Sequence, residues 1–471
     1  MARTAARKAL IKYGFVIPST AGIRDVQVVT GSLPSRGRLN QRFPRPSWRR
    51  SAQRGQVLLG IVFILGIVLS ALFYSFVSPA SSAIERDKIT AAALAQAKDA
   101  LIGYAAAHAT RPGALPCPDT NNDGNGEPAT ASPGGNSCPN YIGRLPWKSL
   151  GLPDTRDGSG ERLWYSLSPN FRNANPPSGP VLNSDTPAEI TISGIPDKII
   201  AVVIAPGAIV GAQDREAADT TKVNSAANYL DGGNENGGSD GKTFTAGPTT
   251  NDKPIAITRD SFFPPVESRV AREIGKLLRD YYDLPLASSP PDYNHYYPFA
   301  APFSGTTCVS GTYRGRIPTT DCPPLKSFAS TLPPWFGPGS TGNRWNEVMV
   351  YGVAPRCTPK IVPGFITPTP TPDTIDNAAL DCNYTTTSYG TSYLSVGTSN
   401  EIQAIVLPGG YGLSGQSRPC ETAADCLEDQ QNTDGPGSYP NTADGADNLI
   451  YVKPQRSSTN NDSLVIVRPY P

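Results

Sequence analysis

Three oxygen-bearing side chains at alternate positions form the clearest candidate for chemistry in this sequence. Asp119, Asn121 and Asp123 precede Gly124 in the stretch DTNNDGNGE, which matches the opening of a calcium-binding loop, D-x-N-x-D-G. Carboxylate and amide oxygens are the ligands that Ca²⁺ prefers, and glycine permits the sharp turn of such a loop. Thr130 stands at the twelfth position, where these loops carry a bidentate acid. The stretch predicts either a calcium site or a plain polar turn.

Residues that enzymes use for catalysis are scarce or scattered in the chain. The sequence holds no G-x-S-x-G element, no glycine-rich phosphate loop and no H-E-x-x-H pair. Its two histidines, His108 and His295, offer little general-base chemistry, and we expect both to be structural. A carboxylate pair for glycoside hydrolysis is the enzymatic alternative that the residue types leave open. We therefore expect a protein that is not an enzyme, with calcium as its one candidate cofactor.

Eight cysteines form the second group of reactive side chains, and their even number is typical of disulfides in an oxidising compartment. The absence of C-x-x-C and the shortage of histidine argue against zinc. About 105 complete pairings are conceivable. Because short loops close with the smallest entropic cost, we expect local pairs. These pairs are Cys117 with Cys138, Cys308 with Cys322, Cys357 with Cys382, and Cys420 with Cys426.

An apolar run near the N-terminus bears on where these residues act. Residues 57–77, VLLGIVFILGIVLSALFYSFV, carry no charge and have about the length of a membrane-crossing helix, roughly 20 residues. Before Gln56 the chain has twelve Lys/Arg and one acidic residue, whereas the remainder has 29 basic and 39 acidic residues. We interpret the basic segment as a topology signal rather than a nucleic-acid-binding region. It predicts a single-pass protein with a cytoplasmic N-terminus and everything after Ser78 outside.

The chain that carries these sites has a composition typical of short strands and long loops. It contains 45 glycines and 48 prolines in 471 residues, and 38% of its residues are hydrophobic. Residues 84–109 are rich in alanine and place apolar residues at near-helical spacing. We expect them to form a stem helix that continues the membrane helix beyond a kink at Pro79. A second helix is predicted at residues 266–282.

Segments in the two halves of the chain follow one another in the same order. They favour a tandem duplication of one α+β module over a chance similarity of strand–turn segments. The matched pairs are RLWYSLSP (162–169) with VMVYGVAP (348–355), IAVVIAPGAIVGAQDR (200–215) with IQAIVLPGGYGLSGQSR (402–418), NDKPIAITR (251–259) with NDSLVIVR (461–468), and LPW (145–147) with LPPW (332–335).

These patterns together predict an α+β fold. A long N-terminal transmembrane-plus-stem helix is followed by two loop-rich, mostly antiparallel β modules. The expected divisions are a cytoplasmic basic leader (1–55), a transmembrane helix (56–78), the stem helix with the first module (79–261) and the second, related module (262–471).

The sequence RRSAQRG followed by QVLLGIVFILGIVL resembles the leader and apolar helix of type IV pilin-like proteins and pseudopilins. The stretch LPCPDTNNDG…GRLPWKSLGLPD…ERLWYSLS is similar to prepilin-like exported proteins of Gram-negative bacteria. The resemblance implies that a prepilin peptidase cleaves after Gly55 and that the amine of Gln56 is methylated. The chain departs from the family in carrying Gly60, where pilins have glutamate at the fifth mature position, and in its long leader.

The resemblance implies a minor pilin or pseudopilin-like subunit displayed outside the bacterial inner membrane, with its bulk in the periplasm or on a surface filament. The implied partners are other pilin-like subunits, which contact the apolar helix, the prepilin peptidase and the membrane; nucleic acid is not expected. The alternative is a signal-anchored envelope adhesin or binding protein that is not assembled into a filament.

Overall fold

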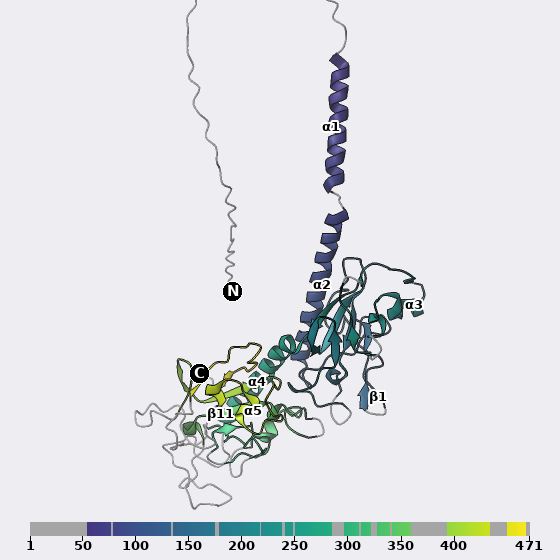
Figure 1. Cartoon of the computed structure of the whole chain (residues 1–471). Coiled ribbons are helices and arrows are strands. Elements are labelled where there is room, and N and C mark those ends of the chain that lie inside the picture. The colour runs from purple at the N-terminus through teal and green to yellow at the C-terminus, as the bar shows by residue number, and fades with distance from the viewer. Residues whose placement is uncertain are drawn as a thin grey trace, which may run out of the picture. The chain divides into compact units, whose positions relative to one another are not determined.

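The computed structural model describes most of the chain from Arg54 onward (Figure 1). The chain divides into two compact units, Met1–Phe73 and Tyr74–Pro471. Of the predicted leader, only Arg54 and Gly55 belong to the described residues. The described ranges are 54–76, 79–132, 135–174, 179–216, 218–237, 241–247, 250–284, 296–309, 312–321, 327–339, 342–358, 393–433 and 450–467.

Two helices occupy the region where one continuous helix was predicted, α1 (Arg54–Phe76) and α2 (Pro79–Ala107). Proline is suited to the first position of α2, because its φ is already helical and an N–H in the first turn has no helical acceptor. Among the described residues, no helix is both long and apolar enough to cross a membrane.

This finding corrects two predictions. The transmembrane-plus-stem helix is wrong for the residues that the structure describes, and so is the single-pass inner-membrane location that depended on it. The prediction depended on the hydropathy and length of residues 57–77 alone. The α+β class with mostly antiparallel sheets, in contrast, is what the structure contains.

The first module contains a four-stranded antiparallel sheet and a smaller three-stranded sheet. All five residues of β7, AVVIA, are buried, as expected for a strand covered on both faces. In the small sheet, β5 pairs antiparallel with β6 and parallel with β8. The large sheet has the order β3 (Ile142–Arg144), β4 (Trp164–Leu167), β7 (Ala201–Ala205), β9 (Lys253–Ile257), and the small one β6 (Ile195–Ile199), β5 (Ile190–Ile192), β8 (Thr243–Phe244). The ribbon β1 (Thr130–Ser132) and β2 (Gly135–Ser137) and helix α3 (Thr220–Asn224) complete it.

The second module repeats both sheets with the same strand order and direction. Its small sheet again joins a central strand to one antiparallel and one parallel neighbour, β13 and β15. The large sheet has the order β10 (Arg314–Gly315), β11 (Met349–Val353), β14 (Ala404–Pro408), β16 (Val465–Val467), and the small one β13 (Ser399–Ile402), β12 (Leu394–Val396), β15 (Ile450–Tyr451). Two short helices, α5 (Ala423–Cys426) and α6 (Gln430–Thr433), belong to the same half.

One tyrosine in each large sheet shows that the two modules correspond in detail. The hydroxyl of Tyr165 in β4 donates to the carbonyl of Pro116 at 3.3 Å. The hydroxyl of Tyr351 in β11 donates in the same way to the carbonyl of Pro298 at 3.1 Å. Both tyrosines are fully buried. Equivalent strands with equivalent tertiary bonds are what a repeated module requires.

The strand register also corrects one of the matches made from sequence. Gly143 is the partner of Tyr165 in the first module, and Gly315 is the partner of Tyr351 in the second. GRLP (143–146) therefore corresponds to GRIP (315–318), and the match of LPW with LPPW at 332–335 is wrong. Both glycines are required by close packing, because an added Cβ would lie 2.6 Å and 2.0 Å, respectively, from a backbone oxygen.

Helices α2 and α4 (Arg259–Asp283) bring the two modules together (Figure 1). α2 contacts β7 and β9, α4 contacts β14 and β16, and the two helices contact each other. One hydrophobic core consequently runs through both modules, in the order sheet, helix, helix, sheet. The Thr258 hydroxyl caps α4 by accepting the N–H of Ser261 at 3.4 Å. The predicted boundary between residues 261 and 262 lies inside the first turn of α4.

Candidate functional site

The predicted calcium loop is closed by its own hydrogen bonds. Asp119 is 1% exposed, and its Oδ1 accepts the N–H groups of Asn121 at 3.1 Å and Asn122 at 2.6 Å. Its Oδ2 accepts the N–H of Gly124 at 2.7 Å. Burial raises the pKa of the Asp119 carboxyl, and these three amides counteract the rise. Both carboxylate oxygens thus face backbone donors rather than an open cation site.

The remaining polar groups of this loop have protein partners too. Asn121 Oδ1 accepts the N–H of Asp123 at 2.9 Å, and Asp123 Oδ1 accepts the N–H of Asn125 at 2.7 Å. The ammonium of Lys148 donates to the Asp123 carbonyl. Within the described part of the chain, no group of three or more His, Cys, Asp or Glu side chains could hold a metal ion. Calcium binding at Asp119, Asn121 and Asp123 stays a prediction.

Two of the four predicted disulfides are formed between described residues. Cys117 bonds to Cys138, and Cys420 bonds to Cys426, which are the pairings predicted from loop length. Cys308 and Cys357 are also disulfide-bonded, but their expected partners, Cys322 and Cys382, lie outside the described residues. No described cysteine is free.

The predicted cleavage position lies at the start of α1. Gly55 and Gln56 are the second and third residues of this helix. Their side chains are not among those that the structure describes, so cleavage between them stays a prediction.

Four consecutive residues of the first module, 182–185, bond to the second module and are called here the docking segment. The N–H of Leu182 donates to Asn343 Oδ1 at 3.1 Å, and Asn183 Nδ2 donates to the Asn343 carbonyl at 3.1 Å. Arg111, in the loop that follows α2, donates to the same Asn343 Oδ1 at 2.8 Å. Arg111 is fully buried, and burial lowers its pKa to about 9. Asn343 therefore joins two separate parts of the first module.

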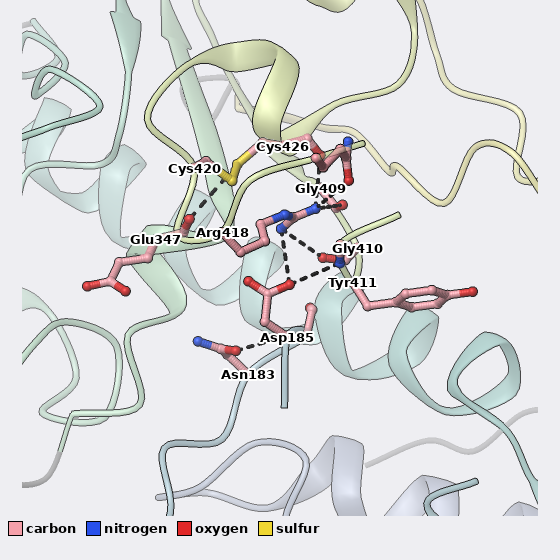
Figure 2. A network of polar contacts seen from close by, with 12 residues as sticks. Asn183, Asp185, Glu347, Gly409, Gly410, Tyr411, Arg418, Cys420 and Cys426 are labelled. Atoms are coloured by element: carbon pink, nitrogen blue, oxygen red, sulfur yellow. Dashed lines mark hydrogen bonds and ion pairs between the residues drawn. A yellow bond between two sulfur atoms is a disulfide. The ribbon is translucent and has the colours of Figure 1, made fainter. Parts of the chain in front are cut away.

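The last residue of the docking segment, Asp185, faces a loop of the second module (Figure 2). Its Oδ1 accepts the N–H of Gly412 at 3.0 Å and lies 3.4 Å from Arg418 Nη1. Arg418 is held in turn by the carbonyls of Gly409 and Gly410, at 3.1 Å and 3.3 Å. Burial raises the pKa of the Asp185 carboxyl, and the positive charge of Arg418 opposes that rise.

A buried glutamate on α4 completes the contact between the modules. Glu267 is 0% exposed, and its two oxygens accept hydrogen bonds from Ser184 Oγ at 2.8 Å and Arg456 Nη1 at 3.1 Å. Burial raises the pKa of Glu267, and Arg456 counteracts this. Because an unpaired buried charge is costly, these bonds position the docking segment, α4 and the C-terminal loop together.

A second polar network lies inside the first module and joins its two sheets. In the first module, Asp252 directly precedes β9 of the large sheet, and its Oδ2 accepts Asn234 Nδ2 at 2.9 Å. Asn234 also exchanges two hydrogen bonds with Thr245, the residue directly after β8 of the small sheet. Asn234 is fully buried, which makes this link well shielded from water.

The second module contains part of this network at equivalent positions, and no hydrogen bond joins Asn432 to Asp462 among the described residues. Asn432 exchanges two hydrogen bonds with Val452, the residue directly after β15. Asp462, in the segment before β16, accepts the N–H of Glu428 at 3.0 Å. The sequence signal for this network was the repeated Asn-Asp pair, at 251–252 and 461–462, which was used only as a landmark. No sequence signal singled out the docking segment.

Comparison with known proteins assigns no family. No family model, no curated protein and no solved structure matches the chain.

Proposed function

We propose that the chain is a non-enzymatic pilin-like subunit that packs through α1 against its own copies and other pilin-like subunits. The exposure of α1 is the observation that carries this proposal. Ten large apolar side chains between Leu58 and Leu69 are 50–73% exposed, and no charged residue separates them. Five of them, at 61–65, are consecutive, so they cover every face of the helix.

A helix that is apolar on all sides is stable only when other apolar groups surround it. Burying one such side chain contributes about 1.5–3 kcal/mol, so association of several α1 helices is strongly favourable. The resemblance of residues 50–77 to the leader and apolar helix of pilin-like proteins points to copies of the same helix as the surrounding groups.

The described side chains also support a non-enzymatic role. His108 Nδ1 accepts the N–H of Arg111 at 3.1 Å, which closes the end of α2. Burial lowers the pKa of His108, and the charges of Arg111 and Arg269 lower it further. One of the two histidines is therefore engaged in structure, while His295 lies outside the described residues.

Co-purification of two differently tagged full-length copies tests the proposal. The wild-type copies are expected to co-purify, and Leu65→Glu in both copies is expected to lower the recovered partner at least about tenfold, which corresponds to about 1.4 kcal/mol. A charge in the middle of the apolar surface must lose its water on association, and that cost is large.

Ala91→Glu provides the matched control, because Ala91 is exposed on α2 and receives the same charge. This variant is expected to associate like the wild type. Equal recovery with Leu65→Glu, or wild-type copies that do not associate, would contradict the proposal. The second result would favour a binding protein that never joins a filament.

A further inference from the structure

Two carboxyl groups meet inside each module. In the first module the N–H of Asp231 donates to Asp252 Oδ2 at 3.0 Å, and the N–H of Asn251 donates to Asp231 Oδ2 at 3.3 Å. The two side chains also lie within hydrogen-bond reach of each other. The other oxygen of each carboxyl, Oδ1, is buried and has no donor among the described residues.

The second module places Glu428 and Asp462 in the same arrangement. The N–H of Glu428 donates to Asp462 Oδ2, and the N–H of Asn461 donates to Glu428 Oε2, both at 3.0 Å. These side chains are within hydrogen-bond reach as well, and Asp462 Oδ1 is buried without a donor. Asp252 and Asp462 are 3% and 0% exposed. Both modules therefore contain a pair of neighbouring carboxyl groups, with Asp231 as the second acid in the first module and Glu428 in the second.

No positive charge among the described residues compensates either pair. Among the described residues, none of the four carboxyls forms an ion pair within 4 Å. The loops beside the pairs contain Arg215 and Arg418, but these bond to Gln213 and Gln416 at 2.7 Å and 3.1 Å. The remaining donors are amides, such as Gln416 Nε2, which donates to Glu428 Oε1 at 2.8 Å. Two carboxylates this close, one of them buried, repel each other, whereas one proton between them makes a strong O–H···O hydrogen bond.

We propose that the carboxyl pair in each module shares one proton, and that in the first module this proton holds the large and small sheets together. The chain of contacts is short. In the first module, Asp252 is held beside Asp231 and accepts a hydrogen bond from Asn234. Asn234 in turn accepts the N–H of Thr245, the residue directly after β8 of the small sheet. Loss of the proton leaves two like charges at this position and loosens the contact between the sheets.

The direction of the pH dependence follows from the two aspartates. Burial is the largest cause that raises the pKa of Asp252 to about 7 and that of Asp462 to about 8, and the neighbouring acid adds to it. In the unfolded chain both carboxyls release their protons near pH 4. The folded chain therefore binds more protons between these values, and stability falls as the pH rises from about 4 to about 8. Above about pH 8 this contribution no longer changes.

Thermal unfolding of the full chain between pH 5 and pH 9 tests the proposal with Asp252→Asn/Asp462→Asn. Asparagine keeps the shape, and its NH₂ group replaces the shared proton. The wild-type Tm is expected to fall by at least about 3 °C between pH 5 and pH 8.5 relative to the variant. Glu85→Gln/Asp99→Asn, at two exposed positions on α2, removes the same number of carboxyl groups and is expected to follow the wild type within about 1 °C.

Hydrogen exchange of residues 241–247, corrected for intrinsic rates, provides a second measurement. Their protection is expected to fall at pH 8.5 in the wild type and to persist in the double variant. Parallel Tm profiles for the wild type and the double variant would overturn the proposal. A rise in the wild-type Tm with millimolar calcium at pH 8.5, absent in the double variant, would also overturn it, because a cation would then join the carboxyls.

Discussion

The side chain of Asp119 organises its loop through three backbone amides, and the second module has Ala301 at the equivalent position. Asp119 exchanges two backbone hydrogen bonds with Arg144, and Ala301 exchanges two with Arg316, which defines the equivalence. The fold of a module therefore does not need an acid at this position. The loop at residues 119–127 is a feature of the first module alone.

Replacing Asp119 by Ala tests how much this carboxyl contributes. The N–H groups of Asn121, Asn122 and Gly124 lose their acceptors, so the free energy of unfolding is expected to fall by about 2–3 kcal/mol. Urea unfolding of the full chain measures the change, and Asp99→Ala on the exposed face of α2 is the control, expected within about 0.5 kcal/mol.

The same variants decide the calcium prediction. If the loop binds Ca²⁺, millimolar calcium raises the wild-type Tm through binding to the native state, and Asp119→Ala or Asp123→Ala abolishes the rise. An unchanged wild-type Tm would leave a polar turn, in agreement with the donors that already occupy both oxygens of Asp119.

At the scale of elements, the docking segment explains how two similar modules become one body. Its four residues each make a different bond to the second module, and α4 supplies the fully buried Glu267 beneath them. Directional bonds of this kind specify one relative arrangement of the modules, whereas the apolar contact of α2 with α4 is non-directional.

A double-mutant cycle on Asp185→Asn and Arg418→Gln measures this directional contribution. Both side chains are partly exposed, at 24% and 11%, so the expected coupling is about 1–2 kcal/mol rather than the value for a fully buried pair. The exposed pair Lys276–Asp280 on α4 is the control, with an expected coupling of about 0.3–0.5 kcal/mol. Equal coupling energies in the two cycles would show that the Asp185–Arg418 contact contributes no more than an ordinary exposed ion pair.

For the molecule as a whole, the decisive feature is the core shared by both modules. Tyr165 of the first large sheet and Tyr351 of the second belong to the same cluster of buried residues, together with the inner faces of α2 and α4. Separate cores would allow either module to unfold alone, but a continuous core couples them.

Residues 74–471 are therefore expected to unfold in one cooperative transition. Hydrogen exchange in urea, followed for peptides of β7 and β14, is expected to give unfolding midpoints within about 0.2 M of each other. Leu278→Ala on α4, where the side chain is fully buried, is expected to lower both midpoints together. A variant that shifts only the β14 midpoint would show that the modules are independent.

Much of the fold could be predicted from the sequence because its signals are local. The runs at 162–169, 200–215, 348–355 and 402–418 contain β4, β7, β11 and β14, and turn residues end them. The helix predicted at 266–282 lies within α4. Cys117–Cys138 and Cys420–Cys426 could be paired because loop-closure entropy depends on separation along the chain.

Other features depend on contacts that no local signal contains. LPPW was matched with LPW by composition. The pairing of Gly315 with Tyr351 shows instead that residues 315–318 are the equivalent of residues 143–146. Arg111 and Asn343 are 232 positions apart, and only the packing of α2 against α4 brings their segments together.

By itself the sequence determined the class of secondary structure, the repeat and the short-range disulfides, because periodicity and loop closure act between near neighbours. Only the tertiary structure decided which polar residues meet, namely the docking segment with Asn343 and the carboxyl pairs at Asp252 and Asp462. The physical reason is that burial and proximity set the charge of a carboxyl, and both arise only when distant segments pack together.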